Sequence, residues 1–206
     1  MSLRLDGRDV SAEGSVLDAV LGAGIDLPHL CKDDHLPAIG ACRTCLVDAD
    51  GRIVAACSVP ASSVREVQTS TDRVERIRRG VLALTAAMGD PRPDLSQGPA
   101  GNEAPHAFAT HPVSGDQFEP RRRESEDSSN SFFSFVETAC ILCGRCVVAC
   151  QQLQHISAIG LAGAGHATRV TPGAGVSFRE SVCTSCGSCV AACPTHALSP
   201  KTGGAA

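Results

Sequence analysis

Cysteines are the residues best suited to do chemistry in this chain, which holds twelve of them in 206 residues. Eight of them form two blocks with the same spacing, C-x2-C-x2-C-x3-C. These are Cys140, Cys143, Cys146 and Cys150, then Cys183, Cys186, Cys189 and Cys193. Pro194 follows the second block directly. Thiolates at this spacing hold 4Fe–4S clusters, and the fourth cysteine of each block ligates the cluster of the other block.

The two blocks therefore predict two 4Fe–4S clusters with crossed ligands. One set is Cys140, Cys143, Cys146 and Cys193, and the other is Cys183, Cys186, Cys189 and Cys150. A short C-x2-C-x2-C loop can wrap three corners of one cube, while the fourth cysteine opens a helix that points to the neighbouring cube. Zinc is the alternative, because C-x2-C pairs also form structural zinc sites. Such sites usually use two separated pairs rather than two runs of four.

The other four cysteines form an N-terminal set with unequal gaps, Cys31-x10-Cys42-x2-Cys45-x11-Cys57. Plant-type 2Fe–2S sites use C-x4-C-x2-C and a distant fourth cysteine. Here the first gap is longer, but the order of a lone cysteine, a pair and a late cysteine is kept. Gly40 and Ala41 are small enough to let backbone N–H groups approach the cluster sulfurs. The spacing predicts a 2Fe–2S cluster on this set, with a four-cysteine zinc site as the alternative.

The elements that must position the N-terminal set form a hairpin, a helix and a second hairpin. The Asp6-Gly7 turn separates two short apolar strands, and Ser15 is a candidate N-cap for a helix that ends near Gly22. Asp50-Gly51 separates strands at 46–49 and 52–56. A hairpin followed by a helix is typical of the start of a β-grasp domain, so residues 1–72 are predicted to be a 2Fe–2S ferredoxin-like domain.

Residues 73–130 are predicted to be a helix followed by a linker. Apolar residues at helical spacing indicate an amphipathic helix over 73–88, with Arg76, Arg78 and Arg79 on its solvent side. The chain then becomes rich in Pro, Gly, Ser and charge up to residue 130. Its three consecutive arginines, 121–123, are followed at once by acids, which disfavours a nucleic-acid patch. His106 and His111 are expected to be solvated rather than metal ligands.

Residues 131–200 are predicted to be a bacterial-type ferredoxin domain with two 4Fe–4S clusters, and 201–206 a disordered tail. Short helices are expected at 147–153 and 190–192, and short strands at 168–170 and 176–178. Phe132, Phe133 and Phe135 are expected to pack over this domain. The fold class is therefore α+β.

Composition and the apolar pattern disfavour nucleic-acid binding, secretion and membrane insertion. Aromatic residues make up 3% of the chain, with no Trp or Tyr, so the stacking surfaces for single-stranded nucleic acid are missing. Residues 1–6 have no apolar signal region, and no run of about 18 apolar residues predicts a membrane span. Clustered cysteines in an intracellular chain indicate metal binding rather than disulfides. A cytoplasmic location follows as an expectation.

Three stretches resemble one family of iron–sulfur subunits. They are Gly40-Ala41-Cys42-Arg43-Thr44-Cys45-Leu46-Val47, Cys140-Ile141-Leu142-Cys143-Gly144-Arg145-Cys146, and the run from Cys183 to Thr195. The family includes the large iron–sulfur subunit of respiratory complex I, the diaphorase small subunit of NAD-reducing hydrogenases, and the catalytic subunit of NAD-dependent formate dehydrogenases. The N-terminal part of the formate dehydrogenase version is the most similar. The family carries a further cubane site with one His and three Cys, but this chain has no cysteine between Cys57 and Cys140.

The resemblance implies an electron-transfer subunit that is not catalytic by itself. It would carry electrons between a molybdenum or tungsten formate dehydrogenase subunit and an FMN/NAD diaphorase subunit. The 2Fe–2S end would face the flavin and the cubane end the catalytic partner. A subunit of an NAD-reducing NiFe hydrogenase is the second possibility, and a free carrier or a zinc scaffold are others. No Ser–His–Asp set, phosphate loop or flavin fingerprint accompanies the cysteines, so no catalytic residue is assigned.

Overall fold

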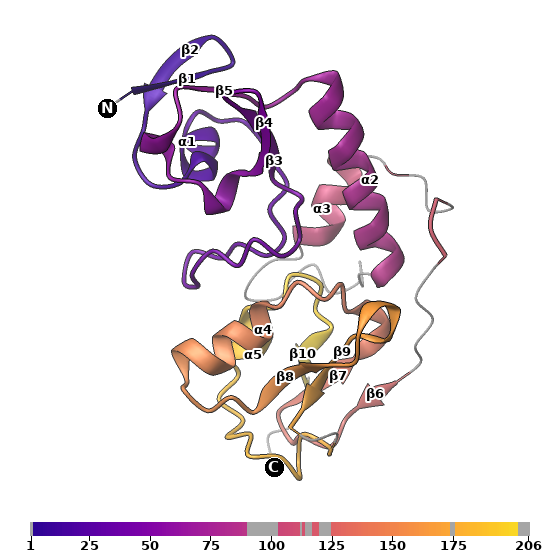
Figure 1. The fold of residues 1–206 in the computed structure, drawn as a ribbon. Coiled ribbons are helices and arrows are strands. Elements are labelled where there is room, and N and C mark those ends of the chain that lie inside the picture. Colours follow the sequence, from indigo (N-terminus) through magenta and orange to yellow (C-terminus); the bar gives the residue numbers. More distant parts are fainter. Residues whose placement is uncertain are drawn as a thin grey trace.

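The computed structural model describes residues 2–89, 103–111, 113, 117–119, 125–173 and 176–201. Figure 1 shows an N-terminal sheet domain above a C-terminal domain, with the long helix α2 running from the first toward the second. The predicted linker residues 91–102, the arginines 121–123 and the tail residues 202–206 lie outside the described part of the chain.

The N-terminal domain is a five-stranded sheet in the order β2-β1-β5-β3-β4. Its strands are β1 (Ser2–Leu5), β2 (Arg8–Ser11), β3 (Leu46–Ala49), β4 (Arg52–Ala55) and β5 (Glu66–Gln68). β1 runs antiparallel to β2 and parallel to β5, so the first and last strands of the domain lie side by side. Short 3-10 helices at Ala56–Ser58 and Ala61–Ser63 lead from β4 to β5.

Helix α1 (Val16–Gly22) packs beside this sheet and begins at the predicted cap. The Asp18 backbone N–H donates to Ser15 Oγ, and the Ser15 N–H donates back to the Asp18 carboxylate at 2.8 Å. This capping box satisfies N–H groups that the first turn leaves unpaired. Val16, Leu17 and Val20 are fully buried beneath it and form the core with the strands. The core is aliphatic, as the composition requires.

Helix α2 (Asp72–Met88) matches the predicted span, but one of its arginines was placed wrongly. Arg76 and Arg79 face solvent, whereas Arg78 is only 6% exposed. Its Nη2 donates to the carbonyls of Leu46 at 2.6 Å and Thr69 at 2.7 Å. Arg78 therefore ties α2 to the end of the sheet instead of extending into water.

The segment predicted as a linker also contains secondary structure. Helix α3 (Glu103–Thr110) lies next to α2 between the two domains, and β6 (Glu126–Asp127) pairs with a strand of the C-terminal domain (Figure 1). His106 on α3 lies 3.1 Å from the carboxylate of Asp26, with both side chains largely exposed. α3 thus contacts the N-terminal domain through a solvated pair, and His111 just beyond it is half-buried.

The C-terminal domain has two small sheets and two short helices. β6, β7 (Phe133–Val136) and β10 (Leu198–Pro200) form one sheet, and β8 (Ile159–Ala162) pairs with β9 (Arg169–Pro172) in the other. Helix α4 (Arg145–Val148) continues into a π-helix (Ala149–Leu153), and α5 is Ser188–Ala191. Single 3-10 turns occur at Glu137–Ala139 and Gly165–Ala167.

Three predictions for this part of the chain differ from the structure. Residues 176–178 are not a strand; instead Phe178 is buried edge-to-face against Phe133, with ring centroids 5.1 Å apart. Phe133 and Phe135 are buried as predicted, but Phe132 is 66% exposed. Lys201, placed in the predicted tail, donates its N–H to the Phe132 carbonyl and so extends the pairing beside β10.

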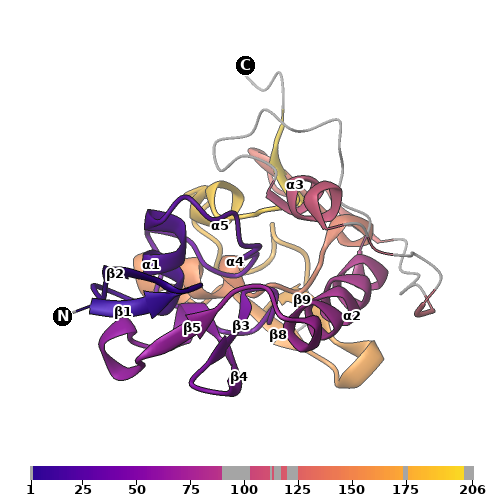
Figure 2. The same ribbon diagram turned by 90° about the horizontal axis from the view of Figure 1, so that it is seen from above.

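In Figure 2, seen from above, α1 overlaps α4 and α5, which Figure 1 shows in the other domain, and residues of all three helices line one cavity. Among the described residues, no helix is both long and apolar enough to cross a membrane.

Candidate metal centres

All twelve cysteines are free thiols. Cys31, Cys42 and Cys45 lie on the loop between α1 and β3, and Cys57 lies on the 3-10 helix that follows β4. Three of the four are buried and Cys42 is half-buried. The antiparallel β3–β4 hairpin brings Cys57 back beside Cys45, whose carbonyl accepts the Ala56 N–H. The fold therefore assembles the first predicted set.

The thiols of this first set shift one another's pKa values. The interaction with Cys31 lowers the pKa of Cys42 to about 6 and that of Cys57 to about 2, and it raises the pKa of Cys31. The Cys45 thiol donates to Cys57, and this contact together with burial raises the pKa of Cys45. Four thiols that act on one another in this way are a donor set that suits a thiolate-bound metal group.

Backbone and hydroxyl groups also approach these sulfurs. Thr44 Oγ1 lies 3.1 Å from Cys42 Sγ, and the Gly40 backbone helps to lower the pKa of Cys57. Gly40 has φ +66°, and a Cβ there would lie 2.7 Å from Ser58 Oγ. A side chain at this position would be strained and would displace the neighbouring hydroxyl. The prediction that a small residue lets backbone N–H groups reach the sulfurs agrees with this geometry.

The C-terminal cysteines of the two blocks act on one another. Burial raises the pKa of Cys146 well above its usual value, and the charges of Cys143, Cys140, Cys193 and Cys189 raise it further. Cys193 follows α5 and is among the charges that act on Cys146, so a residue of the second block lies near the first. Burial likewise raises the pKa of Cys143, with Cys193 as the next cause.

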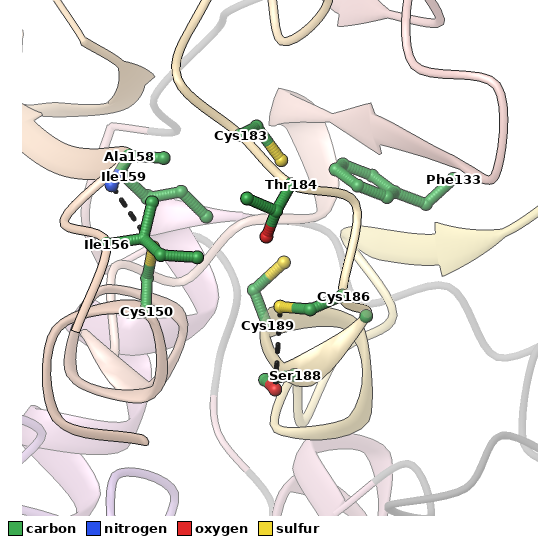
Figure 3. Close-up of a pocket in the computed structure, with 11 residues that line it drawn as sticks. Phe133, Cys150, Ile156, Ala158, Ile159, Cys183, Thr184, Cys186, Ser188 and Cys189 are labelled. Atoms are coloured by element: carbon green, nitrogen blue, oxygen red, sulfur yellow. Dashed lines mark hydrogen bonds between the residues drawn. The ribbon is translucent and has the colours of Figure 1, made fainter. Parts of the chain in front are cut away.

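The second group lines a small apolar cavity, shown in Figure 3. Cys183, Cys186 and Cys189 lie on one wall and Cys150, from the π-helix, on the opposite wall. Burial raises the pKa of Cys189 to about 12, with contributions from the charges of Cys183, Cys186 and Cys150. The Ala158 N–H donates to Cys150 Sγ at 3.2 Å. Cys186 is the one exposed cysteine of the twelve.

A buried apolar cluster, called the seam below, joins the N-terminal cysteine set to the first block of the C-terminal domain. Leu30 and Cys31 of the N-terminal domain pack in one buried cluster with Ile141 and Cys143 of the C-terminal domain. Helix α3 completes this cluster with side chains from its inner face, Ala104, Ala107 and Phe108. The seam was not predicted, although Leu36 and Ile39, two large apolar residues in the loop between Cys31 and Cys42, were a visible signal.

The long gap between Cys31 and Cys42 supplies the rest of the contact between the domains. Leu36 is 5% exposed and packs with Ala149 and Ala192 beside α4 and α5. Ile39 approaches Gly144, where a Cβ would lie 3.9 Å from its Cγ2. The residues added to the plant-type spacing therefore contact the other cysteine domain.

Within the described residues, no three His, Cys, Asp or Glu side chains converge as a single metal ion requires. The fit to a larger group rests instead on the donors, which are sulfur in all three sets.

Comparison with known proteins identifies two domains. Residues 1–72 match the 2Fe-2S iron-sulfur cluster binding domain, and residues 139–197 match the 4Fe-4S dicluster domain. The chain is an iron–sulfur protein. The predicted α+β fold, with an N-terminal 2Fe–2S domain and a C-terminal dicluster domain, is confirmed.

Several relatives are subunits or enzymes of redox systems. The chain is 29% identical to "Putative formate dehydrogenase YrhE" of Bacillus subtilis over 75% of its own length and 16% of that protein. It is 31% identical to the alpha subunit of an NADPH-Fe(3+) oxidoreductase of Geobacter sulfurreducens, over 82% of its length and 20% of that protein. It is 29% identical to a subunit of the NADH-quinone oxidoreductase of Rickettsia conorii, over 83% of its length and 26% of that protein. The chain thus spans about a quarter or less of these relatives.

One solved structure contains a chain that is matched over most of its own length, unlike the relatives above. One chain of a crystal structure of NAD+-reducing [NiFe]-hydrogenase in the H2-reduced state superposes with a TM-score of 0.82 and 27% identity. The match covers 98% of this chain and 88% of that one. The resemblance to iron–sulfur subunits of formate dehydrogenase, complex I and NAD-reducing hydrogenase type, predicted from the cysteine runs, is confirmed.

Proposed function

We propose that this chain is an electron-transfer subunit of a multi-subunit oxidoreductase, and that it is not catalytic by itself. The observation that carries the proposal is the buried seam in which Cys31 and Cys143 belong to one apolar cluster. Such packing holds two thiolate sites at a fixed separation and excludes water from the space between them. The chemistry that iron–sulfur clusters supply when bound is the uptake and release of electrons at potentials tuned by burial and hydrogen bonds to sulfur.

The proposed inventory is one 2Fe–2S and two 4Fe–4S clusters. The first would be held by Cys31, Cys42, Cys45 and Cys57. The other two would be held by Cys140, Cys143, Cys146 and Cys193, and by Cys183, Cys186, Cys189 and Cys150. The mutual effects of these cysteines on their pKa values support the grouping. In each set the protein contributes sulfur donors and backbone N–H groups directed at them.

The proposed partners are an FMN/NAD diaphorase subunit and a catalytic subunit that oxidises formate at molybdenum or tungsten. Similarity to a putative formate dehydrogenase supports formate as the substrate of the catalytic partner. A NiFe hydrogenase partner is the second candidate, favoured by the nearly full-length match to a chain of an NAD+-reducing hydrogenase structure. The exposed Cys186 supports placing the cubane end against the catalytic partner. The cytoplasmic location stays a prediction.

Metal analysis of the purified chain tests the clusters. About ten iron and about ten acid-labile sulfide per chain are expected, with electron paramagnetic resonance (EPR) signals of one 2Fe–2S and two interacting 4Fe–4S clusters. Zinc without sulfide would exclude the redox function. About fourteen iron would mean a further cluster on ligands that the proposal does not include.

The partner is tested on the natively purified complex. Formate added without oxygen should reduce the clusters and give the EPR signals, whereas hydrogen should not. Reduction by hydrogen alone would replace the formate proposal with the hydrogenase one. A chain that elutes alone from size-exclusion chromatography of fresh extract would instead be a free carrier.

A further inference from the structure

Arg145, a buried residue that stands in sequence between two predicted ligands of one cluster, pairs with a carboxylate from the other domain. Arg145 separates Cys143 from Cys146 in sequence and begins α4, and its side chain is 1% exposed. Its Nη1 lies 4.0 Å from Asp33 Oδ2, and the Asp33 side chain is 16% exposed. Asp33 belongs to the long loop between Cys31 and Cys42, so this pair crosses the contact between the two cysteine domains.

The carboxylate is held in place by its own loop. Asp33 Oδ1 accepts the His35 N–H at 2.9 Å, which leaves Oδ2 directed toward Arg145. The neighbouring cation, Lys32, is engaged by the Asp33 carbonyl at 3.1 Å and by Asp34 at 3.2 Å. Leu36 packs a few residues further on and fixes the loop against α4 and α5. The loop therefore presents Asp33 Oδ2 to Arg145.

A polar cavity of about 370 Å³ borders this pair. α1 and the Asp33 loop line one side of it, and Arg145 and Ala191 line the other. The two side chains themselves are largely buried, at 1% and 16% exposed, so the effective dielectric around them is lower than in water and a charge acts over a longer distance.

Arg145 also lies within two residues of two proposed cluster ligands. It is two residues after Cys143 and directly before Cys146, at the start of α4, and its side chain is buried. A positive charge that stabilises a thiolate also stabilises the extra negative charge of a reduced cluster on the same thiolates. It therefore raises the reduction potential, whereas a nearby carboxylate lowers it.

We propose that Arg145 and Asp33 are a positioning pair through which the N-terminal domain sets the reduction potential of the 4Fe–4S cluster on Cys140, Cys143, Cys146 and Cys193. Arg145 raises that potential, and Asp33, delivered by the long loop, partly offsets it. This inference rests on the proposed function, since it requires the cluster. The electron affinity of this site then depends on correct docking of the two domains.

The test is an EPR-monitored redox titration of the natively purified protein and four variants. Arg145→Gln should shift the midpoint potential of one 4Fe–4S signal to more negative values, and Asp33→Asn should shift the same signal to more positive values. Arg145→Lys keeps the positive charge, so its midpoint potential should stay close to that of the parent protein. Asp34→Asn is the matched control, because it removes the same charge one residue away from a side chain that is 97% exposed, and should leave the signal in place.

Opposite shifts on one signal separate an electrostatic role from a structural one. If the substitutions only loosened the domain packing, Arg145→Gln and Asp33→Asn would shift the midpoint potential in the same direction. That result overturns the proposal, and so does an unchanged midpoint potential in both variants. If Arg145→Gln does not fold, the midpoint potentials of Asp33→Asn and Asp34→Asn are compared instead. A positive shift in Asp33→Asn alone supports the proposal, and equal potentials overturn it. Absence of 4Fe–4S signals in the parent protein contradicts the proposed function instead, so the two failures are distinguishable.

Discussion

Gly89, the residue that ends α2, lies directly against the backbone of Cys140. A Cβ built on Gly89 would be 2.5 Å from the Cys140 carbonyl oxygen and 3.1 Å from its nitrogen. Cys140 is the first cysteine of the dicluster domain, so the end of the long helix rests on a proposed cluster ligand. Gly89 itself has extended backbone, with φ −163°, so close approach rather than conformation requires glycine here.

Replacing Gly89 with Ala should therefore displace Cys140. We expect the variant to lose iron from one 4Fe–4S site, seen as about four fewer iron atoms per chain and a missing EPR signal. The backbone contact cannot be relieved by rotating a side chain, since the clashing atoms belong to the main chain.

Gly80→Ala is the control for this variant. Gly80 lies in the same helix, and a Cβ there meets nothing within 4 Å. Alanine has the higher helix propensity, so the control should keep full iron content and gain about 0.5–1 kcal/mol of stability. Equal iron content in the two variants would show that Gly89 does not position Cys140.

The cysteine groups and the elements next to them could be predicted because their signals are local. Ligand spacing within a block constrains which cluster it can hold. Ser15 and the Asp6-Gly7 turn act on neighbouring residues only, and Asp6 and Gly7 have the positive φ values that such a turn needs. These features depend little on how distant parts of the chain pack.

The features that were missed depend on tertiary contacts. Arg78 was assigned to solvent from the helix pattern, but the carbonyls of Leu46 and Thr69 lie within its reach. Helix α3 forms in a Pro- and Gly-rich segment because Ala104 and Ala107 are buried against residues far away in sequence. Residues 176–178 have strand-like composition, but β9 pairs with β8 and Phe178 is used in the core. A pattern within one segment cannot identify its partner.

The crossed ligation can be tested by removing the fourth cysteine of either block. Cys193→Ser should abolish the cluster of Cys140, Cys143 and Cys146, although Cys193 belongs to the other block. Cys150→Ser should abolish the cluster of the second block in the same way. Each variant should lose one distinct 4Fe–4S EPR signal and the magnetic interaction between the two clusters. Cys57→Ser, the control, should remove only the 2Fe–2S signal.

Uncrossed ligation gives a different pattern. In that case Cys150→Ser would alter the signal that Cys143→Ser also removes. The pairing of lost signals between the variants of the two blocks therefore decides between the two arrangements.

Leu36 should contribute to stability by holding the two domains together. Leu36→Ala removes a side chain that is 5% exposed and packs against Ala149 and Ala192, so we expect a loss of about 2–4 kcal/mol in chemical denaturation. Leu21→Ala is the control, because Leu21 is 38% exposed and its truncation should cost about 0.5 kcal/mol or less. Similar losses for both variants would contradict a role for the long loop in docking.

Arg78 should be much more important for folding than its neighbour Arg79. Arg78 is buried and donates to two backbone carbonyls, so Arg78→Ala leaves both acceptors without this partner and opens a gap between α2 and the sheet. We expect a loss of about 3 kcal/mol or more in the free energy of unfolding. Arg79→Ala, at an exposed position of the same helix, should change stability by about 0.5 kcal/mol or less. Urea denaturation of the two variants, followed by circular dichroism, measures the difference in the free energy of unfolding. A loss as small for Arg78→Ala as for Arg79→Ala would contradict the stabilising role of Arg78 and would agree with the solvent-exposed position that the helix pattern predicts.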